Sequence, residues 1–462
     1  MWFCIKTRGT HGCRILYEAV RDYAKEDEKR EFLVAKRLSE RAFEQVRPDA
    51  KGNWLNLTSN DFDKLMPLIH KSAKAGTNAS QEKAVFKLYG NGINTARDDW
   101  VTDFEPRLLT EKVQFFLGEY AKHKPSSKDL DTAIKWSRNL KGKLARGSTE
   151  AFDTAQIRRY AYRPFLPQFG YLSALLIDEL GQWPSFDGPE NRSINFPAAK
   201  GFYSLASDLP TDFHFTGDTK VAALYRYDES GTRIDNITDW SLAEFKKHYQ
   251  PPSGAMPSPQ SSPRGRGSKT PTQPITKKAI FHYVYAVLHD PQYREKYAQN
   301  LKREFPRIPL YGRSNESSEA TFWQWAAWGE TLMSLHIGYE QAAPFALVRI
   351  DVPDEKVRAS GQSPKCILKS DKDAGRITLD SETTLTGVPR EAWSYLLGNR
   401  CAIDWVLDQY KEKKPKDPTI REKFDTYRFV DHKDKVIELL MRVTTVSVET
   451  ARIVAAMKGA GR

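Results

Sequence analysis

The sequence predicts a chain of mixed α/β and α+β structure that is divided into more than one domain. Its 462 residues are enough for about two to four domains. A hydrophobic content of 40% is enough to build packed cores. Strand-like runs come first, a block of helical patterns follows, and from Tyr160 short apolar runs alternate with Gly, Pro, Asn and Asp. This succession predicts strands, then helices, then a region in which both are mixed.

The beginning of the chain predicts short strands around one helix. Two strands, a helix and a third strand are expected in turn at Trp2–Lys6, Cys13–Val20, Ala24–Arg41 and Phe43–Arg47. A strand pair with nothing before it leaves one edge to be covered. We therefore expect residues 1–50 to need a partner, and a chain that begins near Lys51 to be more soluble.

Helical patterns follow, several of them ending at Gly or Pro. Ser59 or Asn60 is a candidate cap for the first of them. The expected helical segments are Asn53–Lys74, Gln81–Tyr89, Asp98–Leu117, Leu130–Leu144, Ile280–Phe305, Ala320–Tyr339 and Ala402–Lys411. The segment Ile280–Phe305 is aromatic-rich, basic and amphipathic, and it ends at the prolines that follow.

One segment has the composition of a linker. Gln250–Pro274 is rich in Pro, Ser and Gly and has almost no large apolar side chain. Such a segment cannot bury enough surface to offset its loss of conformational entropy on ordering. We expect a flexible insertion there.

The overall charge favours a polyanionic partner. With 71 Lys and Arg against 59 Asp and Glu, the formal net charge is +12, which suits nucleic acid. A solvated surface with surplus lysine is the alternative. Cys4, Cys13, Cys366 and Cys401 have no CxxC spacing, which argues against a zinc ribbon or a disulfide framework and favours the cytoplasm. No apolar run approaches the roughly 18 residues of a membrane span.

Motifs for catalysis are not found. Leu88–Gly92 (LYGNG) imitates a cofactor-binding glycine loop, but helix formers precede it and a turn or helix stop is the better interpretation. His289–Tyr293 (HDPQY) imitates the tetrapeptide that holds a flipped adenine, but Gln292 replaces its second proline. His289 or Asp290 is instead expected to break a helix and cap the next one. His282 and His289 are most simply packing or surface residues. The sequence therefore predicts no catalytic residue and no metal site.

Two segments carry the residue types that bind nucleic acid. The stretch Thr132–Thr149 has no acidic residue, and as a helix it would gather cations on one broad face opposite Trp136 and Leu140. Ile157–Phe165 interleaves arginines with aromatic rings. The candidate DNA-binding residues are Lys135, Arg138, Lys141, Lys143, Arg146, Arg158, Arg159, Tyr162 and Arg163.

Each of these signals has a plainer structural interpretation. The basic helix face is equally compatible with mere solvation, and the arginines after Ile157 with ion pairs beside core aromatics. Lys296, Lys302, Arg303 and Arg307 are interleaved with acids, which weakens their case. Trp323, Trp325 and Trp328 are expected in a core and not on a stacking platform.

The order of short motifs along the chain resembles the C-terminal specificity region of type ISP restriction-modification enzymes. The stretch IFHYVYAVLHDPQYREKYAQNLKREF at 280–305, followed by PRIPL, carries the strongest likeness. The other matching pieces are KGNWLN and NDFD (51–56, 60–63), RDDWVTDF (97–104), IKWSRNLKGKL (134–144), YRPF (162–165), ENR (190–192), DFHFTGD (212–218), LYRYDESG (224–231), NITDW (236–240), GVPREAWSYLLGNRCAIDWVLDQY (387–410) and RVTTVSVET (442–450).

The resemblance implies a domain organisation. Residues 1–50 would be the terminal strands of a truncated methyltransferase-like sheet, and 51–160 a mostly helical connecting segment. Residues 161–462 would be an α+β target-recognition domain with the flexible insertion at 250–274. The family's cofactor loop, its methyltransferase tetrapeptide and its upstream nuclease and helicase signatures are missing here, which fits a fragment, a split-gene product or a decayed gene.

The resemblance also implies a function. The chain would bind duplex DNA sequence-specifically and direct adenine methylation performed elsewhere. Its partners would be double-stranded DNA and the methyltransferase and translocase portion of the same system. S-adenosylmethionine is expected only in the missing methyltransferase half, and no cofactor in this chain. Two alternatives stay open. One is a part of an active adenine methyltransferase, completed by a partner, and the other is a nucleic-acid-binding scaffold without sequence specificity.

Overall fold

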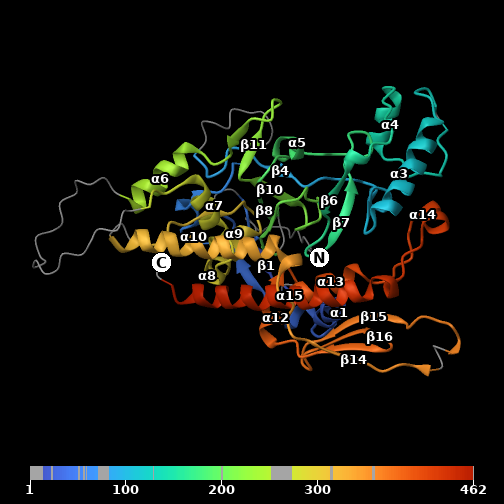
Figure 1. Ribbon diagram of the computed structural model, residues 1–462. Coiled ribbons are helices and arrows are strands. Elements are labelled where there is room, and N and C mark those ends of the chain that lie inside the picture. The colour runs from blue at the N-terminus through green and yellow to red at the C-terminus, as the bar shows by residue number, and fades with distance from the viewer. Residues whose placement is uncertain are drawn as a thin grey trace, which may run out of the picture. The chain divides into compact units, whose positions relative to one another are not determined.

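The fold was analysed in a computed structural model (Figure 1). The structure describes residues 14–21, 24–49, 52–55, 58, 60–70, 83–127, 129–198, 201–250, 273–312, 316–355 and 359–460. The predicted strand Trp2–Lys6, Cys4, Cys13 and residues 251–272 of the expected linker lie outside these ranges. The contacts divide the chain into two units, Met1–Asn60 and Asp61–Arg462.

The first unit is a strand pair with one helix. Its elements are β1 (Ile15–Tyr17), α1 (Glu26–Val34), the 3-10 helix η1 (Leu38–Glu40) and β2 (Glu44–Val46). Strand β1 pairs antiparallel with β2, with Leu16 opposite Gln45. These elements confirm the predicted second strand, helix and third strand. Among the described residues of this unit, Ala24 alone is buried.

The large apolar side chains of the first unit lead to a prediction about solubility. Leu33, Val34 and Leu38 are 57%, 82% and 62% exposed, so the described residues of this unit form little core. We expect the chain without residues 1–60 to be more soluble than the whole chain, because exposed apolar surface promotes association. Comparing the soluble fraction and the light scattering of the two proteins tests this, and equal solubility with slow exchange of the β1 and β2 amides would contradict it.

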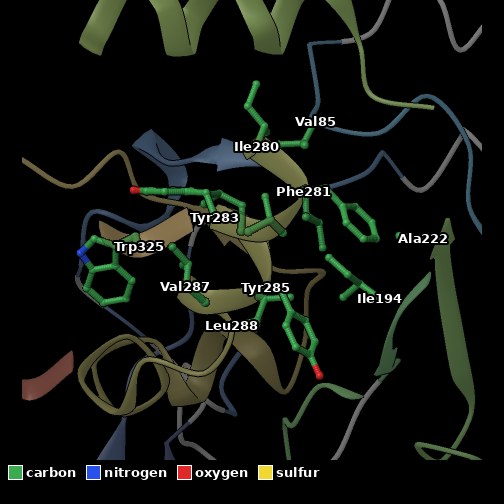
Figure 2. Packing of buried hydrophobic residues seen from close by; sticks show 14 of the residues in the cluster. Val85, Ile194, Ala222, Ile280, Phe281, Tyr283, Tyr285, Val287, Leu288 and Trp325 are labelled. Carbon is green, nitrogen blue, oxygen red and sulfur yellow. The ribbon is translucent and has the colours of Figure 1, made fainter. Parts of the chain in front are cut away.

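A helix that is buried except at its first two residues lies at the centre of the second unit. In α7 (Lys277–Val287) every residue from Ala279 to Val287 is buried. The long helix α10 (Glu316–Ile337) packs along it. Figure 2 shows Ile194 and Ala222 of a neighbouring sheet beside Phe281, with Trp325 near Val287. Burial of Trp325 and partial burial of Trp323 and Trp328 confirm that these tryptophans belong to a core.

This central core corrects the expectation of one amphipathic helix at 280–305. Helix α7 ends at Val287, and two short helices follow, α8 (Pro291–Lys296) and α9 (Ala298–Leu301). Asp290 causes the restart, because its side chain accepts a hydrogen bond from the backbone N–H of Gln292 (3.0 Å) and Pro291 opens α8. The predicted helix break and cap at His289–Asp290 is confirmed. Residues 279–287 are buried on every side because the four-stranded sheet, α10 and α6 (Asp239–Tyr249) pack around them, a fact that a periodicity argument does not reveal.

A four-stranded antiparallel sheet covers one side of α7. Its order is β4 (Gly90–Asn91), β10 (Thr219–Ala223), β8 (Ser193–Pro197) and β9 (Leu205–Ser207). The helix predicted for Gln81–Tyr89 is wrong for the described residues 83–89, where Phe86 instead bridges Ile237. The glycine loop is also corrected, since Gly90 and Asn91 are a strand. At Gly92 a Cβ atom would lie 2.4 Å from the carbonyl oxygen of Asp212, so the close backbone contact requires glycine.

The remaining elements of the central core are short. They are η2 (Phe62–Lys64), β3 (Met66–Pro67), α5 (Trp183–Phe186), β11 (Tyr225–Tyr227), β12 (Arg233–Asp235), α6 (Asp239–Tyr249) and β13 (Arg307–Ile308). Strand β3 pairs with β13, and β11 with β12. The helix predicted near Asn53–Lys74 is wrong for residues 60–70, which form only η2 and β3 without a side-chain cap.

A second, helical core adjoins the sheet. It is built from α2 (Asp98–Val101), β5 (Thr102–Asp103), α3 (Pro106–Ala121), α4 (Arg138–Ala145), the 3-10 helix η4 (Thr154–Gln156), β6 (Ile157–Ala161), β7 (Pro167–Tyr171) and α14 (Pro418–Lys423). Strands β5, β7 and β6 form a three-stranded sheet. The single helix predicted at 98–117 is wrong, because β5 interrupts it and α3 starts anew at Pro106. The domain boundary placed at residue 160 falls inside β6, and the predicted division into domains stays a prediction.

The C-terminal core packs one sheet on two helices. The sheet order is β14 (Val348–Asp351), β17 (Thr383–Thr386), β16 (Arg376–Asp380) and β15 (Cys366–Asp371). Further elements are η5 (Tyr339–Gln341), α12 (Arg390–Ser394), β18 (Leu396–Leu397), β19 (Arg400–Cys401), α13 (Ala402–Gln409) and α15 (Phe429–Lys458). The predicted helices at 320–339 and 402–411 are confirmed by α10 and α13. Helices α10 and α15 lie side by side (Figure 1). Within the described residues no helix is both long and apolar enough to cross a membrane.

A chain of hydrogen bonds joins the central and C-terminal parts. The backbone N–H of Ala206 donates to the hydroxyl of Tyr285 (2.8 Å), which lies 2.5 Å from Nδ1 of His336. The Nε2 atom of His336 lies 3.0 Å from the hydroxyl of Thr450 on α15. A neutral imidazole completes this chain, with Nδ1 accepting and Nε2 donating. Burial lowers the pKa of His336 to about 3, and the charge of Arg294 adds to the effect.

Acid is therefore expected to destabilise the second unit. Below pH 6.5 the unfolded chain binds a proton at this histidine, while the folded chain keeps it neutral. The free energy of unfolding therefore decreases as the pH is lowered from 6.5 to about 3. The loss at pH 5 is about 2 kcal/mol from this one group. Urea unfolding at pH 7 and pH 5 measures it. His336→Gln should be less stable at pH 7 but should lose less between the two pH values, and equal pH dependence in both proteins would contradict the assignment.

Candidate nucleic-acid interface

The basic helix predicted from the sequence exists but is short. Ser137 caps helix α4, because its hydroxyl accepts a hydrogen bond from the backbone N–H of Leu140 (3.0 Å). Gly147 follows the end of the helix, and its positive φ of 73° favours glycine. The predicted helix over 130–144 is wrong before Ser137. Lys135 therefore precedes the helix and does not belong to its face.

Four exposed cations nevertheless gather on and around α4. Lys135, Arg138, Lys141 and Arg146 are exposed, and none has an ion pair with a described residue. We call these four residues the α4 basic patch. The buried side of the helix carries Leu140 and Leu144. A helix with one packed side and one uncompensated basic side is suited to phosphate contacts, which position a protein on DNA.

Lys143 has a different role from the one predicted. Its ammonium group donates to the carbonyl oxygens of Leu175 (3.0 Å) and Ile177 (2.6 Å). Burial lowers its pKa. Because its donors face the protein interior, Lys143 fastens α4 to the loop at 173–178 and is not placed to contact DNA.

A buried arginine fixes the same loop. Arg97 is fully buried, and its guanidinium donates to Asp178 (2.8 Å), to the hydroxyl of Ser137 (2.7 Å) and to the carbonyl oxygen of Leu176. Ser137 in turn donates to Asp178 (2.7 Å). The start of α4 is thus held by the RDDWVTDF motif, which explains how one sequence motif positions the cations of another.

The arginines of β6 are all paired with carboxylates. Arg158 forms two parallel hydrogen bonds with Asp187 (3.0 and 2.9 Å), and this bond is the main cause that raises its pKa. Arg159 pairs with Glu340 of η5. These partners lie 29 and 181 residues away along the chain, so the sequence does not reveal them.

Tyr162 and Arg163 belong to a buried polar cluster. Arg163 donates to the carboxylate of Asp212 (2.7 Å), and its guanidinium lies 3.8 Å from the ring centre of Tyr162. The hydroxyl of Tyr162 donates to Asp98 (2.9 Å). Burial raises the pKa of Asp212, and the charge of Arg163 opposes that shift. The side chain of Arg163 is only 15% exposed, so the cluster mainly joins the helical core to the sheet.

The structure adds a basic segment that the prediction missed. The stretch between α13 and α14 contains Lys411, Lys413, Lys414 and Lys416. Lys414 and Lys416 are exposed and have no ion pair among the described residues, while the other two share Asp408. Helix α14 packs on the helical core through Ile420. The run KEKKPK was the sequence signal that pointed to it.

The other predicted clusters are not placed to act on a ligand. Lys296 pairs with Asp61 (2.8 Å) and Arg307 with Asp63 (3.5 Å), so acids from a distant segment compensate these two cations. His282 and His289 are buried in α7 and in the turn after it. Cys366 and Cys401 are free thiols. Among the described residues no group of three metal-ligating side chains is found.

Comparison with known families identifies the chain. The model of the Type ISP C-terminal specificity domain matches residues 84–439. The chain belongs to this family. The match contains every candidate DNA-binding residue and most of the three cores. It also confirms the resemblance that the short motifs indicated.

Solved structures share the fold of this specificity domain. A cryoEM structure of a DrdV–DNA complex matches with a TM-score of 0.82 and 39% identity, covering 97% of this chain and 43% of that one. The ATP-dependent Type ISP restriction-modification enzyme LlaBIII bound to DNA matches with a TM-score of 0.70 and 21% identity. This match covers 91% of this chain and 26% of that one. A nuclease-deletion mutant of the Type ISP restriction-modification enzyme LlaGI, in complex with a DNA substrate mimic, matches with a TM-score of 0.70 and 23% identity. This match covers 97% of this chain and 33% of that one.

The specificity domain spans less than half the length of each of these proteins. The two matches below 25% identity show a common fold. No curated protein matches the chain.

Proposed function

We propose that this specificity domain binds duplex DNA sequence-specifically and directs adenine methylation carried out by residues outside the chain. The observation that carries the proposal is the similarity to DrdV, at 39% identity over nearly the whole chain, in a structure determined with DNA. The α4 basic patch and the free Lys414 and Lys416 supply uncompensated positive charge on the helical core. The cytoplasm, where a bacterial cell keeps its DNA, is the compartment that goes with this proposal.

The test is a selection of bound sequences from a random duplex library. The enriched sequence is then competed against a scrambled duplex of the same length at a fixed salt concentration. Specific protein–DNA pairs exceed non-specific ones by about 10³-fold or more, and we expect a ratio in that range. A ratio near one would refute sequence specificity and favour the scaffold alternative.

A working methyltransferase is the second candidate function. It is favoured by the length of the matching proteins, since the chain covers 43% of the DrdV chain. A partner that supplies the methyltransferase and translocase portion would then complete the enzyme. Titration calorimetry with S-adenosylmethionine tests this candidate, with the chain alone and with the partner present. We expect no heat of binding for the chain alone. Binding, or transfer of a labelled methyl group to adenine, that appears only with the partner would favour the second candidate.

A further inference from the structure

A polar pocket of about 280 Å³ lies beside the α4 basic patch. Most of residues 93–99 and residues 212–214 line it, and Tyr162 and Lys135 of the patch complete the lining. The volume is just below the range of about 300–1,000 Å³ that is common for small-molecule sites. The pocket therefore suits one part of a larger ligand, such as the edge of a base, better than a whole ligand.

Two of the three carboxylates in the lining are bound to other side chains. Asp212 accepts from the guanidinium of Arg163 (2.7 Å). Asp98 accepts from the hydroxyl of Tyr162 (2.9 Å) with one oxygen and from the hydroxyl of Thr95 with the other. These two carboxylates hold the walls of the pocket together and are not available to a ligand.

The third carboxylate, that of Asp99, makes no hydrogen bond or ion pair with a described residue. Lys112 is the nearest candidate partner, but its ammonium group is already engaged. It donates to the backbone carbonyl oxygens of Asp99 (2.8 Å) and Thr102 (2.7 Å) and pairs with the carboxylate of Asp103 (2.8 Å). Three partners use all three N–H donors of a lysine. The carboxylate of Asp99 therefore keeps its full capacity to accept hydrogen bonds from a ligand.

The position of Asp99 beside the basic patch is unusual for an unpaired acid. Its side chain is open to solvent, yet the walls of the pocket surround it, and this enclosure raises its pKa while the charge of Lys112 opposes the shift. Lys135 acts on the same carboxylate from a distance, without forming an ion pair. A negative charge here repels the phosphates that the patch would bind. It favours DNA binding only where it accepts a hydrogen bond from the DNA.

We propose that Asp99 reads one base of the target, by accepting a hydrogen bond from the exocyclic amino group of a cytosine or an adenine in the major groove. This inference rests on the proposed function and names one of its specificity-determining residues. Carboxylate side chains recognise the amino group of cytosine in this way, and Lys135 of the same pocket is placed to bind a neighbouring phosphate.

Other ligands fit the pocket less well. A phosphate in the pocket itself would be repelled by Asp99. A metal ion is disfavoured because no group of three metal-ligating side chains is found among the described residues. A lysine or arginine of a protein partner would pair with Asp99 but would also lie beside the like charge of Lys135. The amino group of a base is uncharged and is attached to a polyanion, so it suits both neighbours.

The experiment uses the duplex selected from the random library and a scrambled duplex. Each adenine of the selected duplex is replaced in turn by purine, and each cytosine by pyrimidin-2-one, which lack only the exocyclic amino group. Fluorescence anisotropy at one salt concentration gives the affinities of the whole chain and of its Asp99→Ala variant. Glu229→Ala is the matched control, since Glu229 is exposed in the turn between β11 and β12, forms no ion pair with a described residue and does not line the pocket.

Removing the amino group that Asp99 reads should weaken binding by the unaltered chain about tenfold, within the range of one good base contact. Asp99→Ala should bind the selected duplex about tenfold more weakly and should lose nothing further at that one position, while the losses at all other positions persist. The position concerned identifies the base as adenine or cytosine. Binding of the scrambled duplex should become slightly tighter, because a repulsive charge is gone. Glu229→Ala should leave all these affinities unchanged.

A structural role for Asp99 gives a different pattern. Asp99→Ala would then lower the midpoint of thermal unfolding or weaken the selected and the scrambled duplex alike, and either result overturns the proposal. So does an Asp99→Ala variant that keeps the loss at every substituted position. In these cases a preference of the unaltered chain for the selected duplex leaves the proposed function standing, whereas the absence of any such preference overturns both.

Discussion

Replacing all four cations of the α4 basic patch by glutamine is expected to weaken duplex binding by roughly 10³-fold at physiological salt. Each phosphate contact releases condensed counterions and contributes about 0.9 to the slope of log K against log salt concentration. Losing four contacts should lower that slope by about 3.6. Because phosphate contacts carry no sequence information, all duplex sequences should weaken alike. Fluorescence anisotropy at several salt concentrations measures both the affinity and the slope.

A charge-matched pair of variants separates this surface from a general effect of net charge. Arg138→Gln with Lys141→Gln removes two charges from the patch, while Lys246→Gln with Lys247→Gln removes two from α6. The first pair should lower the slope by about 1.8, and the second pair should leave it unchanged. Equal slopes in both pairs would show that α4 does not contact DNA. Lys143→Gln should instead reduce stability, since its ammonium group is bound to backbone carbonyls.

Gly329→Ala is expected to destabilise the second unit strongly. Gly329 lies in α10 where it meets α7, and a Cβ atom there would be 1.8 Å from the carbonyl oxygen of His282. The obstructing atom is backbone, so the two helices must separate. Overpacking of a core costs about 1–3 kcal/mol and occasionally more, and we expect the upper end of that range.

Gly118→Ala is the matched control for this substitution. Gly118 lies in α3 with no atom within 4 Å of the new methyl group. Alanine should stabilise that helix by about 0.5–1 kcal/mol, because glycine is a poor helix former. Urea unfolding of both variants gives the two free-energy changes. If Gly329→Ala were as stable as Gly118→Ala, the close approach of α7 and α10 would be wrong.

Local signals in the sequence predicted what local interactions determine. Helices α10 and α13 followed from their periodicity, and the cap at Asp290 followed from an Asp-Pro pair. The helix expected at 130–144 starts only at Arg138, because Ser137 caps it there and is itself held by the buried Arg97. Glycines 90 and 92 were expected to stop a helix, but a neighbouring strand and the backbone of Asp212 determine their structure.

The candidate site also divides into features that local sequence determines and features that distant residues determine. The α4 basic patch could be predicted, because a stretch of 12 residues without acids needs no distant information. The pairing of Arg158 with Asp187 and of Arg159 with Glu340 could not, because only folding brings those carboxylates near.

The helical core closes with a segment from the other end of the sequence. The indole N–H of Trp100 donates to Asp417 (2.8 Å), 317 residues further along, and Phe424 packs edge-on against the same indole. An exchange of residues 97–171 between two members of the family would therefore transfer the surface of the helical core without Asp417 and Phe424, which pack against Trp100. Chimeras designed to change target preference should carry residues 411–424 from the same parent, and those that mix parents at this contact should lose the transferred surface before its recognition can be assessed.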